Sequence, residues 1–232
     1  MNTNLLLRFA ALLLFIFGIS LQHLLIADAA EDPYLIASKL QAAYEDTAGL
    51  VADFRQRSEM HINRSEKSAS GTVVFLKPGR MRWDYYNPDR QVLICDGKTV
   101  TIYYEKTKQM IVAAAQEYLQ SDVTYSFFTG RGNIMEDFTI SAANDLQDEA
   151  TDSRVIELVP KKAHPQISRL YVWVAEDTSM ITRIRMIDYF DTITDFYFDN
   201  IKRLRVKDKN GPVIDPQLFT FVPPPGTEII YQ

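Results

Sequence analysis

The spacing of apolar residues changes once along the chain, from a helical period near the N-terminus to a period of two. Asp32 followed by Pro33 is typical of the first turn of a helix. Apolar side chains then recur at helical spacing as far as Thr47-Ala48-Gly49, which predicts one amphipathic helix. These side chains are Ile36, Leu40, Ala43 and Tyr44.

From Leu50 onward, apolar and polar residues alternate in short segments, which predicts a series of β-strands. Asp96-Gly97, between two of these segments, is a strong signal for a hairpin turn. Residues 219–222 precede a run of prolines and are expected to form a closing edge strand. The other predicted strands cover residues 50–62, 71–76, 80–86, 91–95, 99–104, 138–141, 155–159, 168–175, 181–189 and 192–202.

Between Val112 and Met135 the alternation stops. Residues 113–120 are rich in helix formers, and Ser121-Asp122 offers a cap before a stretch with a surplus of aromatic side chains. We therefore expect roughly one or two short helices in this segment. The whole pattern predicts an α+β, mostly antiparallel protein, with a strongly curved sheet or open barrel of about ten to eleven strands and helices on one face.

Residues 1–29 differ from the rest of the chain. Arg8 supplies a positive charge, residues 5–25 are almost continuously apolar, and Ala27-Asp28-Ala29 offers small residues for cleavage. This pattern is typical of a secretory signal peptide, with an uncleaved anchor helix as the alternative. Ala30 stands where a bacterial lipoprotein carries its acylated cysteine. We expect an exported protein in which residues 30–232 form a single domain without a lipid anchor of its own.

Composition and charge disfavour several functional classes. The chain has 25 basic and 30 acidic residues, and its net charge of −5 repels the phosphates of nucleic acids. The single cysteine, Cys95, excludes an internal disulfide and is expected to be a small buried residue. The histidines form no ligand cluster for a metal, and His164 is expected on the surface. No catalytic motif is present, and Asp195 and Asp199 are expected to face solvent.

Several predicted strands are apolar on both faces. Val73 and Phe75 alternate with Val74 and Leu76, whereas a sheet with one wet face alternates apolar with polar residues. Two explanations are open at this point. Two packed sheets would bury both faces, and so would a curved sheet around an apolar ligand cavity that the aromatic helical segment closes.

Short motifs follow one another in a set order over nearly the whole of residues 30–232. They are Asp53-Phe54-Arg55-Gln56, Gly71, Lys77-Pro78-Gly79-Arg80-Met81-Arg82-Trp83, Asn87-Pro88, Asp96-Gly97-Lys98, Tyr103-Tyr104 and the ending Phe219-Thr220-Phe221-Val222-Pro223-Pro224-Pro225-Gly226. Each motif is weak alone, but the ordered set resembles the LolA family, the periplasmic carriers of outer-membrane lipoproteins in Gram-negative bacteria.

The resemblance implies an incomplete β-barrel whose helices form a lid over an apolar cavity for lipoprotein acyl chains. It implies a monomeric periplasmic carrier without catalysis, cofactor or metal. Such a carrier receives cargo from an inner-membrane ABC transporter and delivers it to LolB, an outer-membrane receptor. Trp83 and Leu93 match lining positions of the family's cavity, and Val123, Phe127 and Phe128 fall in its lid region. The expected cavity wall comprises Phe54, Phe75, Met81, Trp83, Leu93 and, in the lid, Val123, Phe127 and Phe128.

One position departs from the family pattern. The family often has an arginine immediately before the proline that here is Pro78, and this arginine ties the barrel to the lid. This chain has Lys77 there, which offers a point charge instead of a planar fork of donors. Lys77 is therefore the candidate lid latch, with a solvated lysine at a strand end as the alternative.

Other functions stay open at this level. One alternative with the same fold is a protein that carries or senses another lipid or glycolipid. Two alternatives of different classes are a periplasmic hydrolase that uses a carboxylate pair and an interaction module without a cavity. Bound acyl cargo distinguishes the carrier from the last two, and the chemistry of that cargo distinguishes the two kinds of carrier.

Overall fold

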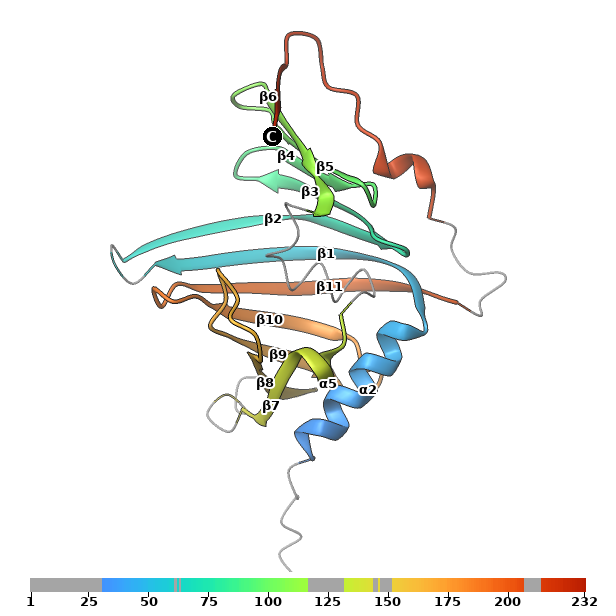
Figure 1. Ribbon diagram of the computed structural model, residues 1–232, viewed down its shortest axis with the longest axis vertical. Helices are drawn as coiled ribbons and strands as arrows, with labels where there is room; N and C mark the ends of the chain where they lie inside the picture. Colours follow the sequence, from blue (N-terminus) through green and yellow to red (C-terminus); the bar gives the residue numbers. More distant parts are fainter. Residues whose placement is uncertain are drawn as a thin grey trace, which may run out of the picture. The chain divides into compact units, whose positions relative to one another are not determined.

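One sheet organises the described part of the chain, with its strands in the order β12-β6-β5-β4-β3-β2-β1-β11-β10-β9-β8-β7 (Figure 1). The computed structural model describes residues 31–60, 62, 64–116, 132–143, 146, 152–206 and 214–232. The elements are α2 (Pro33–Glu45), β1 (Thr47–Met60), β2 (Ser65–Leu76), β3 (Arg80–Asn87), β4 (Gln91–Cys95), β5 (Thr99–Tyr104), β6 (Gln109–Ala114), α5 (Ile134–Asp137), β7 (Phe138–Ala142), β8 (Ser153–Pro160), β9 (Arg169–Ala175), β10 (Ile181–Ile187), β11 (Ile193–Arg205), the 3-10 helix η2 (Pro216–Phe219) and β12 (Glu228–Tyr231).

The predicted fold class is confirmed. The sheet has 12 strands, slightly more than expected, and its two edge strands, β12 and β7, do not pair, so the sheet is open. Neighbouring strands run antiparallel, except that β12 runs parallel to β6. Among the described residues, no helix is long and apolar enough to cross a membrane.

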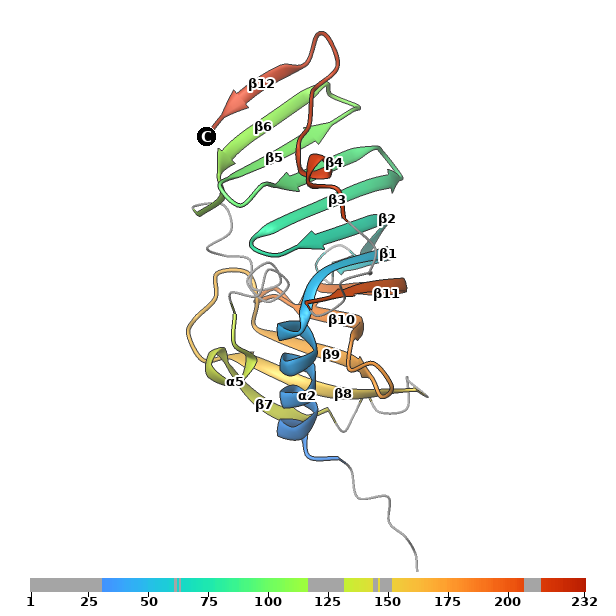
Figure 2. The same cartoon turned by 90° about the vertical axis from the view of Figure 1, so that its right-hand side faces the viewer.

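The first helix lies where its pattern predicts it. The Asp32 side chain caps it by accepting a hydrogen bond of 3.0 Å from the Tyr34 amide, and Pro33 occupies its first turn. The buried stripe of α2 contains Ile36, Leu40 and Tyr44 and packs against β7, β8 and β1 (Figure 2). The helix ends at Glu45, and β1 already begins at Thr47, three positions earlier than the expected Leu50.

Two expectations about strands are wrong. Residues 113 and 114 belong to β6 and not to a helix, because Ala113 and Ala114 pair with β5, and sheet pairing overrides their helical propensity. Residues 219–222 form no strand either. The buried Phe219 is the last residue of the 3-10 helix η2, and residues 220–222 follow it without regular structure. The strand at this edge is β12, which lies beyond the prolines.

The two apolar faces of the first half of the sheet have different partners. One face belongs to a large core cluster that includes Val73 and Phe75 and continues across the sheet to α2. The opposite face, with Val74 and Leu76, is covered by the C-terminal segment through Ile214, Phe219 and Phe221. The chain therefore covers its second apolar face with its own C-terminal segment, which neither of the two sequence-based explanations included.

Predictions about the burial of four single side chains have mixed outcomes. Cys95 is buried, as expected. His164 is not on the surface: it lies buried in a loop, where its Nδ1 accepts a hydrogen bond of 3.2 Å from the Gln166 amide. Asp195 does not face solvent but is buried between two arginines on β10, whereas Asp199 is exposed as predicted.

Candidate functional site

Aromatic rings from β1, β2, β3 and β11 meet around Trp83, on the face that carries the large core cluster. The Trp83 ring lies 4.8 Å from the ring of Phe54, 6.0 Å from Phe75 and 5.7 Å from Phe196, measured between centroids and in edge-to-face orientation. Tyr85 joins the group, with its ring 4.9 Å from that of Phe54. Edge-to-face pairs of this kind contribute about 0.5–1.5 kcal/mol each beyond their buried area.

Strand register explains why these residues gather. Directly opposed residues of antiparallel strands point to the same face, and Phe75 opposes Met81 while Trp83 opposes Leu93. Phe54 lies on β1, and its ring reaches over to Trp83. The structure therefore brings together the five predicted wall residues that it describes. We call this surface, together with Tyr85 and Phe196, the aromatic face.

The aromatic face is not fully covered. Phe54, Phe75 and Met81 are buried, whereas Trp83 and Leu93 are half-buried. On the β7–β9 half of the same cluster, under α2, the apolar side chains are buried more completely. Examples are Ile140, Ile156, Leu158, Leu170 and Val172.

The three predicted wall residues of the lid are not among the described residues. Val123, Phe127 and Phe128 lie outside the described residues, so the lid and the enclosed cavity stay predictions. The sequence did not point to Phe196, a member of the aromatic face, or to Phe198, whose ring lies 6.3 Å from that of Trp83. The two residues alternate along β11, and this alternation predicted the strand but not its position beside β1.

Gly71 permits the close contact between β2 and β3 under the aromatic face. A Cβ at this position would lie 1.8 Å from the carbonyl oxygen of Asp84 and 2.9 Å from the Phe54 ring. The register between β2 and β3 also shifts between Ser70 and Gly71. The glycine of the sequence motif therefore has a packing role here: it lets the Phe54 ring lie directly over the strand.

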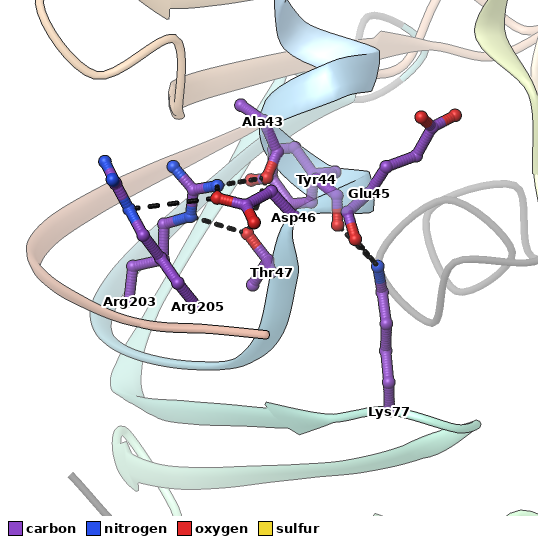
Figure 3. Close-up of polar contacts among 8 residues, drawn as sticks. All are labelled: Ala43, Tyr44, Glu45, Asp46, Thr47, Lys77, Arg203 and Arg205. Carbon is purple, nitrogen blue, oxygen red and sulfur yellow. Dashed lines mark hydrogen bonds and ion pairs between the residues drawn. The ribbon is translucent and has the colours of Figure 1, made fainter. Parts of the chain in front are cut away.

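Lys77 joins the end of β2 to the end of α2 (Figure 3). Its Nζ donates hydrogen bonds to the carbonyl oxygens of Tyr44 and, at 3.4 Å, Glu45. The last carbonyls of a helix lack partners within the helix and carry its negative dipole end, so an ammonium group is well placed there. Burial lowers the pKa of Lys77 from its ordinary value, and the charge of Glu45 opposes this shift.

Arg203 of β11 holds the same helix end from the other side (Figure 3). Its Nη2 donates to the Ala43 carbonyl at 2.6 Å and pairs with the Asp46 carboxylate at 3.1 Å. Its Nε donates to Thr47 Oγ1 at 2.8 Å. Two cations from different strands therefore fix the point at which α2 joins the sheet.

A separate groove of about 430 Å³ lies on the opposite face of the sheet. Its lining includes Arg55, Arg57 and Tyr197, and the two guanidinium groups pair with Asp199 and Glu66. This lining is charged and polar, so the groove does not suit an acyl chain. Within the described residues, no three His, Cys, Asp or Glu side chains gather in a way that would hold a metal ion.

The fold and the aromatic face define an open-sheet protein with a helix-covered apolar face, a class built to keep apolar surface away from water. Within that class, the chain belongs to the LolA family: the family model described as "Outer membrane lipoprotein carrier protein LolA" matches residues 45–221.

Individual relatives share about a quarter of their residues with this chain. The chain is 26% identical over 194 residues to an outer-membrane lipoprotein carrier protein of Methylococcus capsulatus, covering 83% of this chain and 86% of the relative. It is 28% identical over 164 residues to the protein of the same name from Nitrosomonas europaea, covering 71% and 73%. A solved structure of a LolA superfamily protein from Nitrosomonas europaea matches 82% of this chain and 97% of its own, with 14% identity and a TM-score of 0.45.

Proposed function

We propose that this protein is a periplasmic carrier that binds the acyl chains of lipoproteins on its aromatic face and delivers them to the outer membrane. The observation that carries the proposal is the half-buried state of Trp83 and Leu93 within a continuous apolar cluster. Membership of the LolA family, whose model is described as an outer membrane lipoprotein carrier, supports it. Export through a signal peptide at residues 1–29 would place residues 30–232 in the periplasm.

The physical basis of binding is apolar burial. Each methylene that leaves water contributes about 0.8 kcal/mol, so an acyl chain laid along several aromatic and aliphatic side chains gains enough to offset the cost of association. Aromatic rings and branched aliphatic side chains also contact an acyl chain without requiring hydrogen bonds from it. The same surface would bind acyl chains of any origin. Apolar burial alone therefore does not distinguish a lipoprotein from a free lipid, and the cargo has to be identified by its attached polypeptide.

The remaining parts of the carrier follow from the family. The segment that contains Val123, Phe127 and Phe128 would form the part of the lid that completes the cavity. The cargo would come from an inner-membrane ABC-type lipoprotein-releasing complex and pass to a receptor like LolB. The protein would act as a monomer, as the resemblance implies. It would need no catalysis, cofactor or metal, because transfer of an acyl chain between apolar sites breaks no covalent bond.

Native mass spectrometry of the protein purified from the periplasm of its own host tests the proposal. A lipoprotein carrier should be recovered in part as a complex with triacylated polypeptide. Leu93→Asp should abolish the complex by placing a charge on the aromatic face, while Val222→Asp should leave it intact because Val222 is 89% exposed outside that face. Recovery with free phospholipid or glycolipid alone, or without any acyl ligand, would contradict the lipoprotein role.

Lys77 would serve as the latch of the empty carrier. A bond that favours the closed form competes with cargo and lowers the apparent affinity by the fraction of protein that is open. Lys77→Leu should therefore raise the affinity for a fluorescent acyl probe and slow its transfer to an acceptor, while Lys77→Arg should behave like the parent. Lys202→Leu, at an exposed position on β11, is the matched control. Parental affinity and transfer rate in Lys77→Leu would refute the latch.

A further inference from the structure

Two adjacent aromatic side chains protrude from the turn between β10 and β11. Tyr189 is 59% exposed and Phe190 is 71% exposed, although large apolar side chains of this size are normally placed in cores or interfaces. Neither ring contributes to the core clusters of the described residues. We call this turn, residues 188–192, the aromatic tip.

The aromatic tip is held in one conformation by its own polar groups. Asp188 Oδ1 accepts hydrogen bonds from the amides of Phe190 at 2.7 Å and Thr192 at 2.8 Å. Ser168 Oγ donates to the carbonyl oxygens of Ile187 at 2.8 Å and Asp188 at 3.2 Å. These bonds fix the backbone of the turn with both rings exposed, so binding would order the rings but not the turn that carries them.

A third exposed apolar residue lies in the neighbouring turn. Strand β1 pairs with β11 up to Glu59 opposite Ile193, so the turn after β1 and the aromatic tip leave the sheet at the same end (Figure 1). Ile62 lies in that turn and is 83% exposed. Two neighbouring hairpin turns therefore place apolar side chains at one end of the sheet.

We propose that the aromatic tip, together with Ile62, docks this protein on a lipid bilayer. Tyrosine and phenylalanine suit the headgroup region because an apolar ring is combined, in tyrosine, with a polar hydroxyl that stays hydrated. The tip is a short hydrogen-bonded turn with both rings exposed, so it could enter the headgroup region without a matching pocket on a partner. The exposed charges at this end are of both signs, with Arg64 and Lys67 near Glu66 in sequence and Asp191 in the tip, so the apolar side chains and not the charges carry the proposed contact.

Docking at this end would serve the proposed carrier. On β10, Met186 packs against the large core cluster and stands three positions before Tyr189. A bilayer in contact with the aromatic tip would therefore lie next to the apolar face that receives the acyl chain. The docking itself needs no cargo, so it is tested separately from the carrier role.

The test is co-sedimentation of the processed, cargo-free protein with vesicles that contain phosphatidylethanolamine in excess over phosphatidylglycerol. The parent should bind, and the double variant Tyr189→Ser, Phe190→Ser should bind at least about tenfold more weakly, the change expected when exposed rings no longer leave water. The control Val222→Ser, Tyr231→Ser removes apolar side chains that are 89% and 76% exposed elsewhere, and it should bind like the parent. Thermal unfolding followed by circular dichroism checks that each variant is folded.

Two results would overturn the docking proposal: a parent that does not bind vesicles, and equal binding of the parent and the aromatic-tip variant. In the second case, failure of the variant to collect lipoprotein from its transporter would make the tip a protein contact. An acyl-probe titration of the same samples tests the carrier role by itself, and the aromatic-tip variant should keep parental affinity there.

Discussion

Gly71→Ala is expected to destabilise the protein strongly although it adds a single methyl group. The new Cβ would lie 1.8 Å from the Asp84 carbonyl oxygen and 2.8 Å from the Asp84 carbonyl carbon, where non-bonded heavy atoms normally stay about 3.5 Å apart. The obstacle is backbone, so a rotamer change of a side chain cannot relieve it. Strands β2 and β3 have to separate locally, at the centre of the sheet beneath Phe54.

The size of the effect follows from what the separation breaks. About two ladder hydrogen bonds at about 1 kcal/mol each, together with loosened packing of Phe54 on Trp83, give a cost of about 3 kcal/mol. Gly226→Ala is the matched control: its φ is +81° but nothing lies within 4 Å of a Cβ, so backbone strain alone should cost about 1 kcal/mol. Urea unfolding followed by circular dichroism measures both variants. A cost for Gly71→Ala no larger than that for Gly226→Ala would refute this account of the aromatic face.

Two further predictions concern buried ionisable groups. Asp195→Asn should cost about 3 kcal/mol in urea unfolding, because it leaves the largely buried guanidinium groups of Arg183 and Arg185 without their shared carboxylate, whereas Asp199→Asn, in an exposed ion pair, should cost less than about 1 kcal/mol. Equal costs would contradict this difference. Burial raises the pKa of the Tyr44 hydroxyl above its ordinary value of 10.0, so the unfolded chain loses this proton first and stability should fall as pH rises above 10.0. Tyr44→Phe should flatten that fall by up to about 1.4 kcal/mol per pH unit, and an unchanged slope would contradict it.

Local patterns predicted most of the elements because their signals lie within a few residues. The Asp32-Pro33 cap predicted the start of α2, and Asp96-Gly97 predicted the β4–β5 hairpin. The failures arose where distant segments decide the structure. Ala113 and Ala114 are strand residues because they pair with Val100 and Thr99 of β5, and their local pattern does not show this partner.

Side-chain environments were harder to predict than strands. The alternation along β11 suggested that Asp195 faces solvent, and this prediction failed. A strand pattern cannot show that two arginines of β10 lie over the Trp173 ring and pair with the Asp195 carboxylate. The apolar outer face of the first strands posed a similar problem. Its cover, the segment with Phe219, comes from the far end of the chain. The five wall candidates on β1 to β4 lie on one face because they share an alternating pattern and a register, and their role as a cavity wall stays a prediction.

The central claim is that the aromatic face binds acyl chains, and the two tryptophans of the chain allow a direct measurement. Trp83 is half-buried on this face, whereas Trp173 is 2% exposed and packs with Arg183 on the opposite face. In Trp173→Phe, emission comes from Trp83 alone and should shift to the blue and saturate when a triacylated lipopeptide is titrated in. In Trp83→Phe, emission from Trp173 should stay constant. Constant emission from Trp83, with no heat of binding by calorimetry, would contradict the claim.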